Sequence, residues 1–194
     1  MRSAVGLTVA FLAGGAALAQ DLPDRREALR IVFEADAALE SVVYPHPSLN
    51  DAEVQILSNA IGQGLLPAME FYGALAIAPD AGLADPQTTT AVGNYHDAES
   101  AAAAALARCD AARDGEGAAC VVVLEVRPAG WEAGAPLQLS AGAVAALRGD
   151  FRDLPRPRVF AISPMSGQFG SGADEAAALA ACGAEDCRAV VADP

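Results

Sequence analysis

The segment from residue 95 to 99 holds the residue types most able to do chemistry in this chain, an imidazole beside two carboxylates. His96 titrates near neutral pH, so it could act as a general base or a metal ligand with Asp97 or Glu99. The same segment suits the start of a helix, where Asp97 or Ser100 caps the first turn and Glu99 complements the helix dipole. The spacing favours this capping role, and His96, Asp97 and Glu99 are kept as candidate site residues.

Other candidate residues are weaker. His46 lies between two prolines, which is typical of a solvated loop histidine. Trp131 could anchor a ligand or close over the edge of the core, and it is kept as a candidate. The glycine-rich run 167–172 matches neither the G-x-G-x-x-G motif nor the Walker A motif of phosphate-binding loops, and no lysine follows it. Acidic residues also occupy the start of the next helix, where a phosphate would bind. Ser166 lacks the frame of a nucleophile elbow. The sequence therefore assigns no catalytic residue, no metal site and no cofactor.

The elements that position these residues form an internal repeat. Residues 71–128 hold an apolar strand ending in Ala-Pro, a return strand, an alanine-rich helix ending in Cys109, then Cys120 and a valine run. Residues 158–194 hold a shortened copy with Cys182 and Cys187. Such short units cannot bury their sheets alone. The sequence predicts an α+β fold in which two β-β-α-β units share one mixed sheet.

The cysteines follow the repeat, since each copy carries its own pair at equivalent places. This favours the disulfides Cys109–Cys120 and Cys182–Cys187 among the three possible connectivities. A zinc site is the alternative, but neither pair has the short spacing of zinc ligands. Paired cysteines are typical of exported proteins.

The first residues have the pattern of a signal peptide. Arg2 precedes an apolar run from residue 4 to 18, and Ala17-Leu18-Ala19 is a cleavage motif. The alternative is a buried N-terminal helix. Cleavage of residues 1–19 leaves residues 20–194 as one disulfide-stabilised domain, periplasmic or secreted and without a membrane span.

The rest of the chain is read as helices around the repeat. Apolar spacing predicts a helical hairpin over residues 24–66, with a first helix from Arg25 to Val43 and a second capped near Asn50. A connecting helix over residues 140–152 is capped by Ser140. These helices are expected to cover the faces of the sheet.

The charge excludes some partners. The chain has a net charge of −13, and all twelve basic residues are arginine. An acidic surface repels phosphate backbones, so nucleic acid is not expected as a partner. A protein or small-molecule partner is expected, and the oligomeric state is not indicated.

The second copy carries a recognisable pattern. Ala161-Ile162-Ser163-Pro164, the alanine-rich helix ending in Cys182, and Cys187 before Val190-Val191 resemble small exported alphaproteobacterial proteins of unknown function with paired-cysteine β-α-β repeats. The resemblance covers roughly residues 71–194, and Leu137-Gln138-Leu139-Ser140 adds to it. Proteins of this kind often carry the label 5-aminolevulinate synthase. That enzyme binds pyridoxal phosphate through a lysine, and this chain contains none, which contradicts the label.

These observations indicate an exported, non-catalytic binding or envelope-associated module. The alternative is a small periplasmic hydrolase or metal-dependent enzyme using His96 with Asp97 or Glu99. The position of His96 discriminates between them, because an enzyme needs this side chain in a concave site beside a second polar group.

Overall fold

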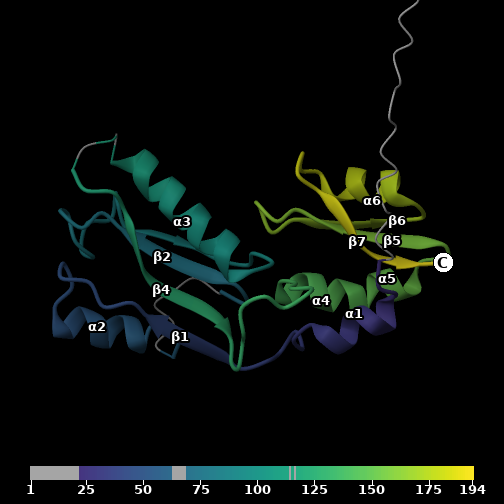
Figure 1. The fold of residues 1–194 in the computed structure, drawn as a ribbon, viewed down its shortest axis with the longest axis horizontal. Coiled ribbons are helices and arrows are strands. Elements are labelled where there is room, and N and C mark those ends of the chain that lie inside the picture. The colour runs from purple at the N-terminus through teal and green to yellow at the C-terminus, as the bar shows by residue number, and fades with distance from the viewer. Residues whose placement is uncertain (1–21, 63–68, 114, 116) are drawn as a thin grey trace, which may run out of the picture.

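The computed structural model of the chain describes residues 22–62, 69–113, 115 and 117–194. The predicted signal peptide lies outside these residues. The described residues form two lobes side by side, each built on an antiparallel sheet that lies between helices (Figure 1). The α+β class is therefore confirmed.

The first lobe holds four strands in the order β1-β4-β2-β3, with α3 on one face and α2 on the other. Its elements are β1 (Leu39–Val43), α2 (Asp51–Ser58), β2 (Gly73–Ile77), β3 (Thr90–Val92), α3 (Ala98–Ala112) and β4 (Val121–Pro128). Alternation along β2 separates two core clusters. Ala74 and Ala76 pack with the alanines of α3, while Leu75 and Ile77 pack with Leu57 of α2. Small side chains let α3 approach the sheet closely.

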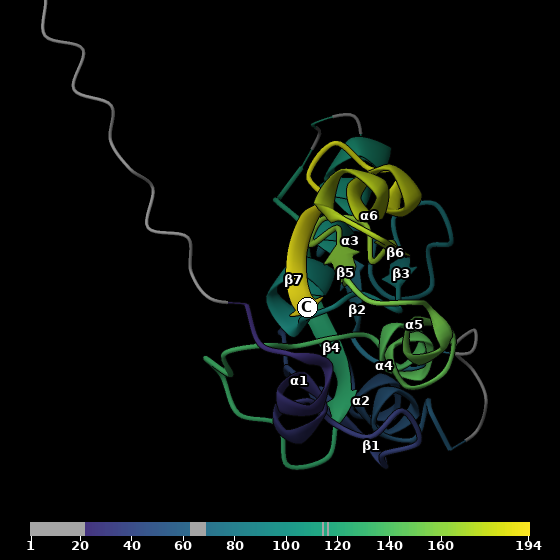
Figure 2. The ribbon, with the colours of Figure 1, turned by 90° about the vertical axis from the view of Figure 1, so that its right-hand side faces the viewer.

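The second lobe holds three strands in the order β6-β5-β7, with α6 on one face and α1 and α4 on the other (Figures 1 and 2). Its elements are α1 (Arg25–Ile31), α4 (Ala141–Arg148), α5 (Asp150–Asp153), β5 (Arg158–Ile162), β6 (Phe169–Gly172), α6 (Glu175–Cys182) and β7 (Arg188–Asp193). Ala161 lies against Ala178 of α6, and Phe160 and Ile162 belong to the cluster with Leu147 of α4. Both lobes thus have small residues under the helix that ends in cysteine.

The two lobes share further detail. The strands β3-β2-β4 and β6-β5-β7 follow the same order, and each unit has its helix before its last strand. The register shifts between Leu75 and Ala76 in the first lobe, and between Phe160 and Ala161 in the second. These two positions are equivalent when the Ala-Ile segments of the two copies are aligned.

The prediction of one shared mixed sheet is wrong. The described strands form two separate sheets, and every strand pair is antiparallel. The prediction assumed that β4 and β7, whose apolar runs suggest burial, both needed a neighbouring strand from the other copy. Instead β1 pairs with the free edge of β4, and β7 remains at the edge of its sheet. The helices of each lobe cover both faces, so neither sheet needs the other for burial.

The predicted helical hairpin is also wrong. Helix α1 ends at Ile31, and residues 39–43 form β1, which pairs with β4 from Leu39 opposite Pro128 to Val43 opposite Leu124. The valines of this segment favour a strand once a partner edge is present, and that pairing overrides the helical spacing. Helix α2 does begin at Asn50, through a capping box with Glu53. Residues 63–66 of the predicted hairpin lie outside the described residues.

The connecting helix is confirmed in outline. Ser140 is the N-cap of α4, and its Oγ accepts a hydrogen bond from the Ala143 N–H. The helix is interrupted at Gly149, after which α5 begins.

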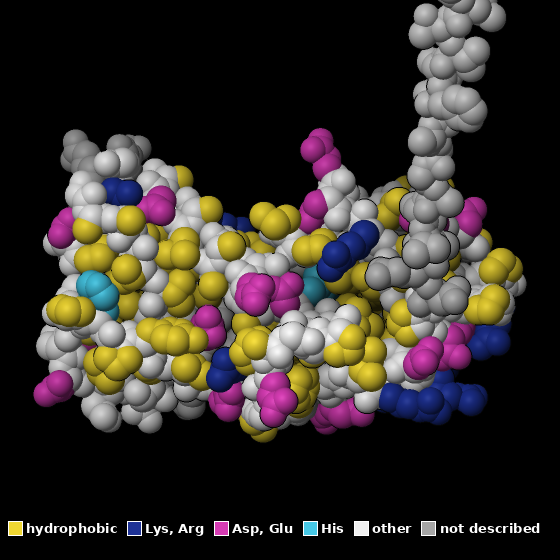
Figure 3. All heavy atoms as spheres, in the orientation of Figure 1, with side chains coloured by type: hydrophobic (Ala, Val, Ile, Leu, Met, Phe, Trp, Pro, Cys, Tyr) yellow, Lys and Arg dark blue, Asp and Glu magenta, His cyan; other side chains and the backbone are white. Residues whose placement is uncertain are grey.

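The two lobes differ in charge. Residues 33–139 carry three arginines and fifteen acidic residues, whereas residues 22–32 and 140–194 carry eight arginines and nine acidic residues. Arginine side chains, dark blue in Figure 3, gather at the lower right end, in the second lobe. The net negative charge of the chain is therefore concentrated in the first lobe.

Both predicted disulfides are present. Cys109 is bonded to Cys120 and Cys182 to Cys187, and the described residues contain no free cysteine. Each bond ties the end of the lobe's alanine-rich helix to the residue before its last strand.

We expect the two disulfides to contribute unequally to stability. Cys109 and Cys120 are 11 residues apart and Cys182 and Cys187 only 5, so the chain-entropy model assigns about 3 and about 2 kcal/mol to them. Urea unfolding of Cys109→Ala/Cys120→Ala and of Cys182→Ala/Cys187→Ala measures both losses. A larger loss in the second variant would contradict the loop-length argument.

Candidate functional site

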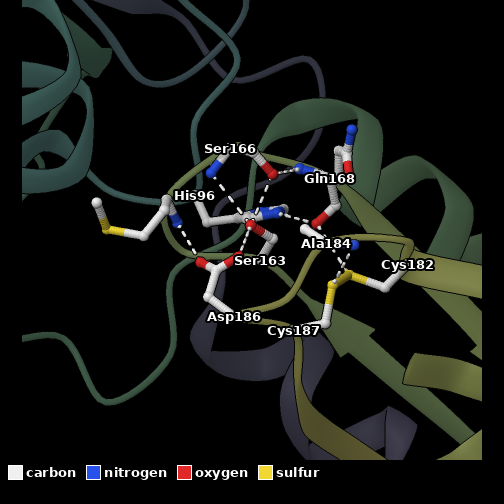
Figure 4. The surroundings of a disulfide bond; sticks show 9 residues. His96, Ser163, Ser166, Gln168, Cys182, Ala184, Asp186 and Cys187 are labelled. Carbon is white, nitrogen blue, oxygen red and sulfur yellow. Dashed lines mark hydrogen bonds between the residues drawn. A yellow bond between two sulfur atoms is a disulfide. The ribbon is translucent and has the colours of Figure 1, made fainter. Parts of the chain in front are cut away.

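His96 lies at the junction of the two lobes and is buried, with 1% of its surface exposed. Its Nδ1 accepts a hydrogen bond from the Ser140 N–H at 3.1 Å, at the start of α4. Its Nε2 donates to the Gln168 carbonyl at 3.0 Å, just before β6. Figure 4 shows the ring beside Gln168 of the second lobe, although His96 itself precedes α3 of the first lobe. His96 is therefore a connection between the lobes.

These partners fix the protonation state of His96. Nδ1 accepts, so the proton lies on Nε2 and the ring is neutral. Burial lowers the pKa of His96 below its usual value, although the Gln168 carbonyl and the charge of Asp97 act in the opposite direction. Both ring nitrogens are occupied inside the protein, so neither is available to a substrate or metal ion. The structure does not place His96 in a concave site.

We expect His96 to make stability depend on pH. Because the folded state favours the neutral ring, the unfolded chain takes up the proton first, and the free energy of unfolding decreases as pH falls below about 6.5. The decrease ends once pH falls below the lowered pKa of the folded state. Urea unfolding between pH 5 and 8 measures this slope.

Two variants test whether His96 causes this dependence of stability on pH. His96→Gln should reduce stability by about 1–3 kcal/mol at pH 8, since the buried Ser140 N–H loses its acceptor, and should flatten the pH dependence. His46→Gln is the matched control, in a loop where His46 Nδ1 accepts from the Ser48 N–H. An unchanged slope in the His96 variant would show that other groups cause it.

Asp97 and Glu99 have the roles expected at a helix start. Asp97 is the N-cap of α3, and its two carboxylate oxygens accept from the Ser100 N–H at 2.6 Å and the Ser100 hydroxyl at 2.9 Å. Glu99 is exposed in the first turn. In residues 95–99, which the sequence offered as the first catalytic candidates, Asp97 therefore caps α3 and His96 forms a buried junction between the lobes.

Trp131 makes two contacts that hold the loop between β4 and α4 in place. Its Nε1 donates to Gln138 Oε1 at 2.6 Å, and the guanidinium of Arg127 lies 4.5 Å from the centre of its ring. The side chain is partly buried against the core of the first lobe. Trp131 thus closes over the core edge, which was one of its two expected roles.

The glycine-rich run serves helix packing. A Cβ on Gly170 would lie 2.2 Å from the Cys182 nitrogen, and one on Gly172 would lie 2.5 Å from the Ala177 Cβ. Both glycines belong to β6 and let α6 lie directly on that strand. The run therefore does not form a phosphate loop.

Sequence reasoning missed a hydroxyl–carboxylate cluster beside the second disulfide. Ser163 donates to Asp186 Oδ1 at 2.7 Å, Ser166 donates to the Ser163 hydroxyl at 2.6 Å, and the Met165 N–H donates to Asp186 Oδ2 (Figure 4). The Ser163 hydrogen bond is the main reason that the pKa of Asp186 is lowered, against a smaller effect of burial. Ser163 is fully buried, so the cluster holds the turn after β5 to the loop before β7.

The first lobe has a similar hydrogen bond between an aspartate and the loop before its last strand. Asp80, in the turn after β2, accepts from the Ala118 N–H at 2.7 Å, in the loop before β4. In both lobes an aspartate joins these two segments next to the disulfide. The sequence signal was an aspartate in the turn of one copy and before the last cysteine of the other.

A cleft of about 720 Å³ lies between the two lobes. Asp97 lines it from the first lobe, and residues 135–138 line it from the connecting loop. The second lobe contributes α1 and the start of β7. The polar side chains are Glu27, Asp97, Gln138 and Arg188, and the apolar ones include Leu22, Ile31, Leu137, Ile162 and Val190. This volume and mixed lining are those of a small-ligand or peptide site.

The described residues also lack two other kinds of feature. Within the described residues, no group of three or more His, Cys, Asp or Glu side chains could hold a metal ion. The same residues contain no helix long and apolar enough to cross a membrane.

In comparisons with known proteins, no protein-family model, no curated protein and no solved structure matches the chain.

Proposed function

We propose that the protein is an exported, non-catalytic binding module and that the cleft between its lobes is the ligand site. The observation that carries the proposal is the lining of this cleft, where Arg188, Glu27 and Asp97 lie among apolar side chains. Ligand sites combine a few polar groups with a mainly apolar wall in this way.

The position of the candidate catalytic groups also supports a binding role. His96 uses both ring nitrogens in hydrogen bonds that join the lobes, and the Ser163 hydroxyl donates a hydrogen bond to Asp186 inside the fold. A nucleophile or base has to reach a substrate from a concave site. The hydrolase or metal-enzyme alternative would need groups other than these.

Export of the protein is part of the proposal. The leader pattern of residues 1–19 and the two disulfides support a periplasmic or secreted protein that begins at Gln20. Intact mass measurement of protein taken from the periplasm or the medium tests this. A chain that keeps residues 1–19 and remains in the cytoplasm would contradict it.

We also propose that residues 71–128 and 158–194 are copies of one module. The equal strand order, the register shift at equivalent positions and the equivalent disulfides support this. The first copy would have gained β1 and α2, and the second copy α1 and α4, as cover for the opposite face.

The binding function is tested by nuclear magnetic resonance on ¹⁵N-labelled protein of residues 20–194. Fractions of small molecules and peptides from the periplasm are added separately. We expect at least one fraction to shift the backbone amide signals of residues 135–138 and 188–190, which line the cleft. If no fraction shifts these signals, the proposed function is wrong.

A further inference from the structure

We propose that the cleft binds an extended peptide that carries a carboxylate, and that this peptide adds as a strand to the outer edge of β7. The inference rests on the proposed function, because it names the ligand class for the same cleft. It depends on the outer edge of β7, on a backbone hydrogen bond already made there, and on the exposed guanidinium of Arg188.

Among the strands that the structure describes, β7 is the last of its sheet, so no described strand pairs with its outer edge. It pairs with β5 on one side only, from Ile162 opposite Arg188 to Arg158 opposite Asp193. Edge strands present unpaired backbone groups, which an extended peptide can use. The first half of β7, residues 188–190, lines the cleft. A peptide in the cleft would therefore meet this part of the edge.

The protein's own chain already makes one backbone hydrogen bond to the second half of β7. The Ala192 N–H donates to the Pro23 carbonyl at 3.1 Å, and the Arg25 N–H donates to Asp193 Oδ1 at 3.3 Å. The segment that contains Pro23 runs alongside β7 and then enters α1. At Ala192 the outer N–H of β7 therefore bonds to another backbone carbonyl, and the cleft lies along the same strand toward Arg188.

Arg188 indicates the charge of the ligand. Its side chain is exposed at the cleft and makes no hydrogen bond or ion pair with any residue that the structure describes. The Ser163 hydrogen bond is the main cause of the lowered pKa of Asp186, and the charge of Arg188 adds a smaller effect, so Asp186 lies within electrostatic range of this guanidinium. By contrast, the guanidinium groups of Arg25, Arg127 and Arg158 are held by carbonyls or carboxylates. A guanidinium binds a carboxylate through two parallel hydrogen bonds, and no described residue makes this contact with Arg188.

The other side chains of the cleft suit an alternating peptide. Leu22 and Ile31 are exposed and offer an apolar surface in the cleft, on which one side of a strand can pack. Gln138 accepts from Trp131, which leaves its amide N–H groups for a peptide carbonyl. Glu27 makes no ion pair with the described residues and can accept from an amide or a basic group. Main-chain bonds would give affinity, and these side chains would select the sequence.

The test uses fluorescein-labelled synthetic peptides of eight residues, in which valine and threonine alternate with varied positions. Each peptide is made with a free C-terminal carboxylate, with an internal glutamate, or with neither. We expect peptides of the first two kinds to bind protein of residues 20–194 by fluorescence anisotropy, and to shift the amide signals of residues 188–190. The neutral peptides should bind about tenfold more weakly or worse.

Two controls separate strand addition from general attraction. The best peptide is remade with alternate backbone nitrogens methylated, which removes its main-chain donors and should abolish binding. Arg188→Gln should weaken binding about tenfold or more, whereas Arg152→Gln should leave it unchanged. Arg152 carries the same charge in the same lobe, is 59% exposed and does not line the cleft.

Each outcome decides a separate claim. If small molecules shift the cleft signals but no peptide does, the proposed function stands and the peptide inference is wrong. If peptides bind equally well when methylated, or bind Arg188→Gln normally, strand addition guided by Arg188 is wrong. If neither class of ligand shifts the cleft signals, the proposed function and this inference both fail.

Discussion

Gly170→Ala should destabilise the second lobe by at least about 3 kcal/mol, at the upper end of overpacking effects. The added Cβ would lie 2.2 Å from the Cys182 nitrogen and 2.4 Å from the Ala181 carbonyl carbon. These are backbone atoms of α6, so relief requires the whole helix to move away from β6. Urea unfolding measures the loss.

Gly142→Ala is the matched control for that variant. Its Cβ would meet Phe169 Cε1 at 3.6 Å, which is ordinary contact, and Gly142 lies inside α4. Alanine favours a helix over glycine by up to about 1 kcal/mol, so this variant should be unchanged or more stable. Equal stability of both variants would contradict the close packing of α6 on β6.

Asp193→Ala should cost about 3–5 kcal/mol, because it leaves Arg158 buried without its counter-charge. Asp193 is 3% exposed, and its Oδ2 accepts from Arg158 Nε at 2.9 Å and Nη2 at 2.5 Å. Arg156 lies 3.2 Å from the same oxygen. Arg158 also donates to the carbonyls of Arg152 and Leu154, so it holds the end of α5.

A double variant tests whether the loss comes from leaving the charge of Arg158 unpaired. Asp193→Ala/Arg158→Met removes both charges, so it should be more stable than Asp193→Ala alone. If the double variant is less stable by the sum of the two single losses, the two charges do not depend on each other.

The same pair predicts an acid transition. Burial acts to raise the pKa of Asp193, but the hydrogen bonds of Arg158 and of the Arg25 backbone outweigh it, so the pKa lies below its usual value. The stabilisation is present above the pKa of an unfolded aspartate, about 3.9, and is lost as pH falls through the lower folded value. The decrease in stability below about pH 4 should be smaller in the double variant.

The features that the sequence predicted well are local ones. Asp97 and Ser140 cap helices whose first residues follow directly, and each cysteine pairs within 11 residues of its partner. The apolar runs of both copies became strands at nearly the expected places. Such features depend on neighbours that a short window of sequence contains.

The features that it missed depend on distant partners. Residues 39–43 became a strand because β4, more than 80 residues later, has a free edge. His96 became a junction because Ser140 and Gln168, 44 and 72 residues away, meet it between the lobes. The cleft, to which both lobes contribute, has no signature in any one segment of the sequence.

The contact between α1 and β7 has a consequence for the order of events in synthesis. A chain that emerges N-terminus first completes the strands of its first lobe once Pro128 is out. The second lobe closes only when Asp193 reaches the Arg25 backbone 168 positions earlier. Helix α1 is therefore among the first elements made and among the last to be docked. Until then the apolar face that contains Ala28 stays without its cover, and the large sequence separation of this contact should make closure of the second lobe slower than that of the first.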